Sequence, residues 1–219
     1  MIDAQRIQAL RDGPTAAEIR RHRLIVVLRR VEPRAALVQL VGELADAGAR
    51  VFEVTFDGDD AGGDLAAIRD RLGGRGDGPF VFGAGTVRTP QQLEAARAAE
   101  AEFGVAPVLD RLVLEAALGA GLPFVPGAFS PTEVDAAWRA GATFVKLFPG
   151  SSLAPGHVRE LRGPMPEIET IVTGGVDGSN AGAFLDAGAV AVGIGSALVR
   201  ASADERRRVI ASIAGRATS

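Results

Sequence analysis

The chain alternates regularly between short apolar, β-branched runs and longer amphipathic stretches rich in Ala, Leu, Arg and Glu. This alternation is typical of repeated βα units that share one parallel sheet. Eight such units are predicted. The strands are expected at residues 23–29, 51–56, 79–84, 102–105, 123–126, 143–147, 168–172 and 190–194. The helices are expected at residues 33–47, 62–73, 89–99, 110–120, 131–140, 155–162, 178–187 and 203–214.

Eight parallel βα units close most naturally into a (β/α)8 TIM barrel, and 219 residues is a compact size for that fold. The alternative is an open, doubly wound sheet that binds a dinucleotide. Against it, the glycine turns at residues 83–88 and 193–198 both lack the third glycine of a dinucleotide fingerprint. We therefore predict a single barrel domain over residues 1–219, with residues 1–22 as an N-terminal helical extension.

Composition excludes several classes of protein and site. The chain has no cysteine, which excludes disulfides, thiolate nucleophiles and cysteine-ligated metals. A net charge of −3 without clustered basic residues argues against a nucleic-acid partner. The least polar stretch, residues 187–199, is shorter than the roughly 20 residues of a membrane span. Charged residues within the first dozen positions argue against a secretory signal, so a cytoplasmic protein without membrane contact is expected.

Lys146 is the only lysine in the chain, and it lies in the apolar, β-prone run at residues 143–149. Alternation along the predicted strand places it on one face with Phe144 and Phe148. Burial disfavours the ammonium form and lowers the pKa, which allows a lysine to act as an amine nucleophile towards a carbonyl. The alternative is a purely structural ion pair between Lys146 and Glu53 inside the barrel.

Other polar residues lie at or near the carboxyl ends of predicted strands, where barrel active sites are built. Glu53, in the second strand, is the natural acid/base partner of the amine. Arg29 closes the first strand and offers a fork for a substrate carboxylate, although spacing alone does not distinguish it from Arg30. Thr86 follows the third strand and either binds a substrate oxygen or serves only in a turn.

Two glycine-rich loops follow the seventh and eighth predicted strands, at residues 173–180 and 193–196. Close backbone approach, exposed N–H groups and a following helix N-terminus make such loops the usual phosphate site of a barrel. The alternative is that they are tight turns without a ligand.

With these residues in place, the sequence resembles the class I 2-keto-3-deoxy-6-phosphogluconate and 2-keto-3-deoxy-6-phosphogalactonate aldolases, which also act on 4-hydroxy-2-oxoglutarate. The resemblance extends from about residue 23 to residue 200. It is carried by Glu53-Val54-Thr55, Gly83-Ala84-Gly85-Thr86-Val87, Phe124-Val125-Pro126-Gly127, Val145-Lys146-Leu147-Phe148-Pro149, Thr173-Gly174-Gly175-Val176 and Gly193-Ile194-Gly195-Ser196.

The resemblance implies that Lys146 is the Schiff-base lysine and Glu53 the general acid/base. Substrate contacts are expected at Arg29, Thr86, Pro107, Phe148, Gly174, Gly175, Gly195 and Ser196. It also implies a (β/α)8 barrel, a homotrimer, and catalysis without a metal or another cofactor.

The chain departs from the family pattern at two places. The gluconate-type enzymes carry an arginine four positions after the glutamate, where this chain has Asp57, a residue expected to repel a substrate carboxylate. The galactonate-type enzymes instead carry an arginine at the end of the first strand, which matches Arg29. Ala106 and Val108 beside Pro107 replace small polar residues, so a change in substrate preference is expected.

The expected reaction is cleavage of a 2-keto-3-deoxy-6-phospho sugar acid to pyruvate and glyceraldehyde 3-phosphate. Three alternatives stay open from the residues. They are an aldolase for unphosphorylated 4-hydroxy-2-oxo acids, a phosphate-binding isomerase or epimerase of the same fold, and a catalytically inactive, ligand-binding barrel.

Overall fold

The computed structural model describes residues 3–76 and 78–216. Its parallel strands are β1 Leu24–Leu28, β2 Val51–Thr55, β3 Val81–Gly85, β4 Phe103–Val105, β5 Phe124–Val125, β6 Gly127–Ala128, β7 Val145–Leu147, β8 Thr170–Thr173 and β9 Ala191–Ile194. The α-helices are α1 Ala4–Arg11, α2 Pro14–His22, α3 Arg34–Asp46, α4 Ala61–Leu72, α5 Pro90–Ala98, α6 Arg111–Gly119, α7 Pro131–Arg139, α8 Pro155–Arg162, α9 Ala181–Asp186, α10 Ser196–Val199 and α11 Ala203–Ala214, and a 3-10 turn, η1, spans Gly150–Ser152.

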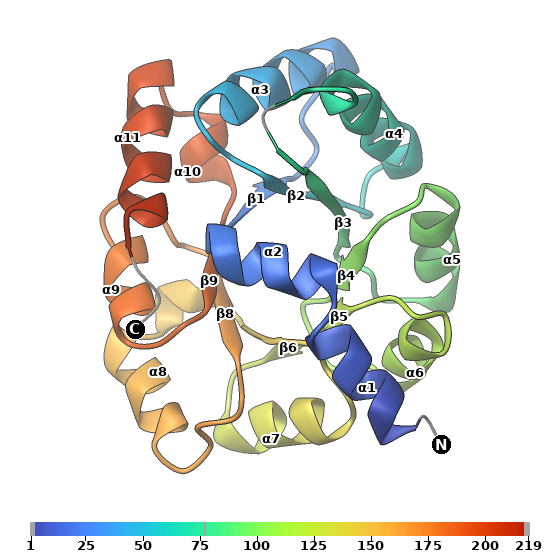
Figure 1. The fold of residues 1–219 in the computed structure, drawn as a ribbon, viewed down its shortest axis with the longest axis vertical. Coiled ribbons are helices and arrows are strands. Elements are labelled where there is room, and N and C mark those ends of the chain that lie inside the picture. Colours follow the sequence, from blue (N-terminus) through green and yellow to red (C-terminus); the bar gives the residue numbers. More distant parts are fainter. Residues whose placement is uncertain (1–2, 77, 217–219) are drawn as a thin grey trace.

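The strands form a closed ring, with helices α3 to α11 around it and α2 across one end (Figure 1). Hydrogen bonding gives the order β5-β4-β3-β2-β1-β9-β8-β7-β6. The two end strands, β5 and β6, are halves of one extended segment interrupted by Pro126, which has no N–H to donate. Because β5 pairs with β4 and β6 pairs with β7, this segment joins both edges of the sheet. The predicted (β/α)8 barrel is confirmed.

Most element boundaries lie within two or three residues of those predicted, and two differences have clear causes. Helix α9 begins at Ala181 rather than at residue 178. The preceding residues form a turn, in which Asp177 Oδ1 accepts from the Ser179 amide at 2.8 Å and Asn180 Oδ1 accepts from the Asp177 amide at 3.0 Å. Helix α10 was not predicted, because four residues are too few to show a helical period.

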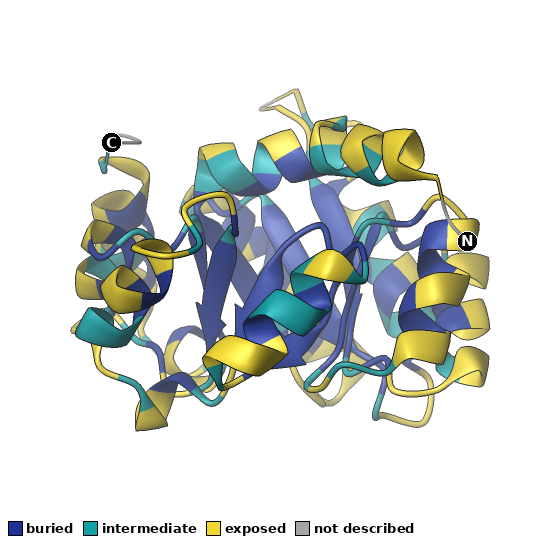
Figure 2. Cartoon of the chain, turned by 90° about the horizontal axis from the view of Figure 1, so that it is seen from below, coloured by how far each residue is buried: buried dark blue, intermediate teal, exposed yellow. Residues whose placement is uncertain are grey.

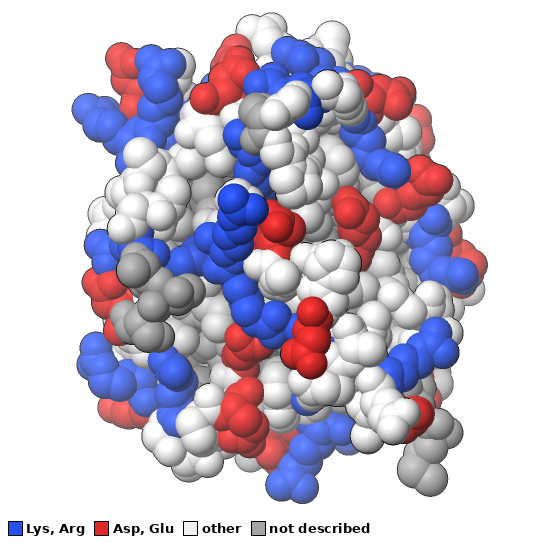
Figure 3. All heavy atoms as spheres, viewed as in Figure 1, with Lys and Arg blue, Asp and Glu red and all other residues white. Residues whose placement is uncertain are grey.

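The predicted N-terminal extension forms α1 and α2, while residues 1–2, and residues 217–219 at the other end, lie outside the described residues. Helix α2 crosses the ring at the amino ends of the strands (Figure 1). Its buried Ala16 and Ile19 belong to the same apolar cluster as the inward-facing strand residues. Arg20 fastens the helix to Glu169, with Nε donating to Oε1 at 2.8 Å. This end of the barrel is therefore closed, and its outer face carries interspersed charges of both signs (Figure 3).

The strands are buried on both faces, and exposure is confined to the outer helices and loops (Figure 2). The cluster inside the barrel includes Val51, Phe144 and Ile171. Because side chains alternate along a strand, Glu53, Lys146 and Thr173 also point into the barrel, two positions nearer its carboxyl end. No described helix is both long and apolar enough to cross a membrane.

Candidate active site

Lys146 projects from β7 into the barrel and is only 7% exposed. Its Nζ lies 5.0 Å from the centroid of the Phe148 ring, so the predicted apolar surroundings are present. Burial lowers the pKa of the amine, the charge of Glu53 opposes that effect, and the nearby Arg29 guanidinium reinforces it. A lysine in this environment gives up its proton more readily than one in water, as a carbonyl nucleophile requires.

Glu53 projects inward from β2 and is 1% exposed. Its carboxyl group occupies the space above Gly85 of β3, where an added Cβ would lie 1.9 Å from Glu53 Oε1. Burial raises the pKa of this carboxyl, while the charges of Lys146 and Arg29 lower it. Among the described residues, no ion pair within 4 Å joins Glu53 to Lys146. The two groups therefore influence each other's pKa without forming the structural ion pair considered from the sequence.

Arg29 and Thr86 meet at the carboxyl ends of β1 and β3. Arg29 Nη2 donates to Thr86 Oγ1 at 3.0 Å, and Arg29 Nη1 donates to Asp57 Oδ2 at 2.6 Å. Arg30 also donates to the main-chain oxygen of Asp57, at 2.8 Å. Asp57 thus lies between two arginines. The negative charge of Asp57, which was expected to repel a substrate carboxylate, is thus compensated by two guanidinium groups.

The loop after β8 has the backbone geometry expected of a close-approach site. Gly174 and Gly175 have φ values of +83° and +80°, which residues with a Cβ rarely adopt. A Cβ at Gly175 would also lie 2.5 Å from the Cβ of Ser151, in the η1 turn after β7. Gly195 and the exposed Ser196 begin α10 after β9, the strand that pairs with β8. The two predicted phosphate loops therefore follow neighbouring strands.

Pro107 and Phe148 lie on opposite sides of the β6 segment. The Pro107 carbonyl packs so closely on Gly127 that a Cβ there would lie 2.1 Å from its oxygen, and Gly127 is the register partner of Lys146. Phe148 is 36% exposed and packs against Gly174. Pro107 therefore lies beside the strand partner of Lys146, and Phe148 lies beside the predicted phosphate loop.

Two hydroxyl groups inside the barrel were missed by the sequence analysis. The side-chain oxygens of Thr55 and Thr173 are buried and have no hydrogen-bond partner in the structure. Thr55 shares a face with Glu53, and Thr173 shares a face with Ile171, the register partner of Lys146. The alternation of side chains along β2 and β8 would have indicated that both hydroxyl groups point into the barrel. Unpaired buried hydroxyls beside the reacting groups are suited to a polar substrate.

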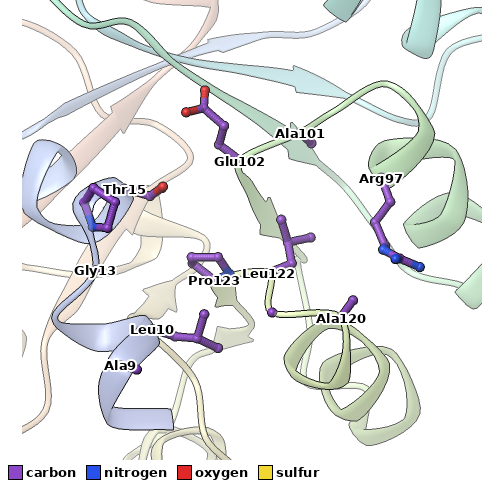
Figure 4. A pocket seen from close by; sticks show the side chains of 12 residues that line it. Ala9, Leu10, Gly13, Thr15, Arg97, Ala101, Glu102, Ala120, Leu122 and Pro123 are labelled. Carbon is purple, nitrogen blue, oxygen red and sulfur yellow. The ribbon is translucent and has the colours of Figure 1, made fainter. Parts of the chain in front are cut away.

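A separate pocket lies at the opposite, amino end of the barrel, between the α1–α2 turn and the segments before β4 and β5 (Figure 4). It has a volume of about 420 Å³ and is lined partly by Arg97, Glu102 and Leu122. Glu102 accepts from the Phe82 amide at 2.8 Å, and burial raises the pKa of its carboxyl. None of the predicted site residues lines this pocket.

Comparison with known proteins identifies the family. The family model "KDPG and KHG aldolase" matches residues 16–212. The 2-dehydro-3-deoxy-6-phosphogalactonate aldolase of Escherichia coli K12 is 33% identical over 185 residues, which cover 84% of this chain and 88% of that protein. The chain belongs to the KDPG and KHG aldolase family. The resemblance inferred from its motifs is confirmed.

Two further family members are informative. The 2-dehydro-3-deoxy-phosphogluconate aldolase of Treponema pallidum is 36% identical over 157 residues, which cover 71% of each chain. The crystal structure of KDPG aldolase from Legionella pneumophila, with pyruvate captured as a covalent carbinolamine, has a TM-score of 0.78 and 25% identity. It covers 92% of this chain and 97% of its own. A covalent adduct with pyruvate is therefore known on the same fold within the family.

Proposed function

We propose that the protein is a class I aldolase that cleaves a 2-keto-3-deoxy-6-phospho sugar acid to pyruvate and glyceraldehyde 3-phosphate. The observation that carries the proposal is the single lysine, buried inside the barrel with a lowered pKa and opposite a buried carboxyl group. Membership of an aldolase family, and the pyruvate carbinolamine of the Legionella relative, support the same chemistry.

In the proposed reaction, the uncharged Nζ of Lys146 attacks the 2-keto carbon. The carbinolamine that forms loses water to give an iminium ion, which draws electrons from the neighbouring carbon–carbon bond. Burial helps twice, because it keeps the free amine available and strengthens electrostatic effects around the cation. The lysine therefore supplies the electron sink for cleavage.

Glu53 moves the protons in this proposal. Its carboxylate takes the C4 hydroxyl proton, and the C3–C4 bond breaks. The aldehyde leaves, and the electrons of the C3–C4 bond move into the iminium to form an enamine on Lys146. The protonated Glu53 then returns a proton to C3. Water hydrolyses the resulting iminium, which releases pyruvate and restores the amine. A carboxyl whose pKa is raised towards neutrality by burial is suited to both proton transfers.

We assign the two ends of the substrate to the two polar edges of the barrel mouth. Arg29 and Thr86 bind the carboxylate, and Phe148 and Pro107 line the path between them and the phosphate. The phosphate is held by Gly174, Gly175, Gly195 and Ser196. Main-chain N–H groups of glycine loops suit a phosphate because they carry no side chain to block its approach.

We further propose that the chain acts as one domain in a homotrimer. Three large apolar side chains near the ends of β4 and β6 are unusually open, with Val108 50%, Leu112 72% and Phe129 43% exposed. Such residues are suited to contact with another copy of the chain. A cytoplasmic location fits the proposed substrate, because a phosphorylated sugar acid does not cross a lipid bilayer unaided.

The proposed function is tested by supplying 2-keto-3-deoxy acids that differ in C4 configuration and in the 6-phosphate, and coupling pyruvate release to lactate dehydrogenase. Release from a phosphorylated acid is the expected result. Release only from unphosphorylated 4-hydroxy-2-oxo acids would move the assignment to that substrate class. Isomerisation without release, or binding without reaction, would replace it with a non-aldolase barrel.

A further inference from the structure

Arg29, Asp57 and Thr86 form a chain of hydrogen bonds across the carboxyl ends of β1, β2 and β3. We propose that Asp57 is a positioning residue, which fixes Arg29 and Thr86 as a two-donor site for the carboxylate of a 2-keto acid. The inference rests on the proposed function and deepens it, because it assigns a role to the aspartate that stands where the gluconate-type enzymes carry an arginine.

The direction of each hydrogen bond follows from the donors available. A guanidinium group can only donate, so the 3.0 Å contact between Arg29 Nη2 and Thr86 Oγ1 makes the threonine oxygen the acceptor. The hydroxyl proton of Thr86 is then directed to another acceptor. Arg29 uses its other amino group on Asp57, at 2.6 Å, and keeps further N–H groups for a ligand. One carboxylate can therefore accept from Arg29 and Thr86 together.

The charges in the cluster favour an incoming anion despite the presence of Asp57. Partial burial would raise the pKa of Asp57, but the charges of Arg29 and Arg30 act against that effect, and the pKa is lowered. The aspartate is thus ionised at neutral pH. Arg30 Nη2 lies 3.5 Å from Asp57 Oδ2, so two guanidiniums share one carboxylate. The cluster keeps one unit of positive charge for a substrate carboxylate.

The backbone at the cluster is held in an unusual conformation. Arg30 and Thr86 have φ values of +47° and +58°, in the left-handed region. The other described non-glycine residues with positive φ, Arg23 and Glu100, lie just after α2 and α5, where helices commonly end in this way. Arg30 and Thr86 have no such explanation. Strain of this kind persists where surrounding contacts enforce it, and it gathers at functional sites.

The cluster is also close enough to the reacting groups to serve them. Thr86 directly follows Gly85, which packs against the Glu53 carboxyl group, and the charge of Arg29 lowers the pKa of both Lys146 and Glu53. In a 2-keto acid the carboxylate carbon is bonded directly to the keto carbon. A carboxylate held by Arg29 and Thr86 therefore brings the carbonyl towards the amine, as the chemistry requires.

The test compares Asp57→Asn with the wild-type enzyme in steady-state pyruvate release. The asparagine keeps the volume and removes the charge that holds Arg29. We expect KM to rise about tenfold, the effect of losing one charge-assisted hydrogen bond, while kcat changes by less than about threefold. Asp57→Glu should recover part of the loss. Asp59→Asn is the matched control, since Asp59 lies exposed two residues further along the same loop.

A KM that is unchanged or lower in Asp57→Asn would overturn the inference, because the aspartate would then be neutral towards the substrate or compete with it. A fall in both kcat and thermal stability without a rise in KM would show that Asp57 has only a structural role, and this result would also overturn the inference.

A binding experiment separates this inference from the proposed function. In a Lys146→Met background, which forms no Schiff base, pyruvate binding is followed by NMR with and without Asp57→Asn. About tenfold weaker binding supports the carboxylate site even if the wild-type enzyme proves not to be an aldolase. The opposite result is an active wild-type enzyme whose Lys146→Met form binds pyruvate equally well with Asp or Asn at position 57. That result would keep the aldolase assignment and refute the role of Asp57.

Discussion

At the scale of single residues, the chemistry depends on two ionisable side chains inside an apolar barrel. An ammonium ion removed from water without a close partner costs several kcal/mol, so burial favours the neutral amine of Lys146. The same burial favours the protonated form of Glu53. Burial thus makes the neutral form of each group more accessible, so Lys146 can act as a nucleophile and Glu53 can both take up and return a proton.

The pH dependence of adduct formation tests this coupling. The negative charge of Glu53 raises the pKa of Lys146 against the effect of burial, so Glu53→Gln should lower the pKa of the amine further. The acid limb of pyruvate adduct formation should therefore move to lower pH than in the wild-type enzyme. Aldol cleavage itself should fall about 100- to 10,000-fold, because the proton carrier is lost.

The adduct is followed by mass spectrometry after borohydride reduction at a series of pH values. Glu115→Gln, on the exposed face of α6, is the control and should leave the acid limb in place. An acid limb that moves to higher pH in Glu53→Gln would show that the carboxyl group does not stabilise the ammonium form.

At the scale of elements, the position of the acid depends on its neighbouring strand. Gly85 leaves the space that the Glu53 carboxyl fills, and Gly127 leaves the space for the Pro107 carbonyl beside the β7 lysine. Glycine is required at these two positions because a neighbouring group packs against the backbone there, and not because the chain turns. Strand β3 is thus part of the acid/base machinery although it supplies no acid or base.

Gly85→Ala should displace Glu53, since the new Cβ would lie 1.9 Å from Oε1. We expect a loss of about 100-fold in kcat, from misplacement of the carboxyl group, and of about 1–3 kcal/mol in the free energy of unfolding, from overpacking. Gly119→Ala is the control, because no heavy atom lies within 4 Å of a Cβ at that site at the end of α6. It should stay within about 1 kcal/mol of the wild type. Urea unfolding and the coupled assay measure both effects, and equal behaviour of the two variants would refute the steric argument.

The elements were largely predictable from the sequence, but the contacts at the barrel mouth were not. Apolar runs and helical stretches located all the strands except β6, and they identified Lys146 and Glu53 as charged residues within buried strands, because these patterns follow from burial on both faces of a closed sheet. Asp57 is contacted by Arg29 and Arg30, which lie 28 and 27 positions away in the sequence, and Arg30 adopts a left-handed conformation that no local pattern in an arginine pair indicates. For this reason the sequence predicted repulsion at a place where the structure has a compensated cluster.

At the scale of the whole molecule, the barrel has one closed and one polar end. Helix α2 covers the amino ends of the strands and is held there by Arg20. Arg11, at the end of α1, stacks its guanidinium 3.4 Å above the Trp138 ring. The predicted catalytic, carboxylate and phosphate residues all lie towards the other end. The open apolar side chains also follow β4 and β6 at that end, so assembly and catalysis are expected to share one side of the molecule.

Leu112→Glu should dissociate the proposed homotrimer. Leu112 is 72% exposed in the single chain, so a charged side chain there is compatible with the monomer fold. In a trimer, each subunit would lose about 2 kcal/mol of apolar burial and would bury a charge. Sedimentation velocity measures the change, with Leu112→Met as the conservative control. A wild-type chain that sediments as a monomer, or a Leu112→Glu chain that remains trimeric, would contradict the proposed assembly surface.

The central claim is that the buried amine of Lys146 forms a Schiff base with a 2-keto acid. Incubation with pyruvate, reduction by borohydride and peptide mass spectrometry measure it directly. We predict one reduced pyruvate adduct per chain, on Lys146, which is absent from Lys146→Met. A wild-type chain that stays unmodified while it releases pyruvate from substrate, or an adduct on another group, would contradict the account.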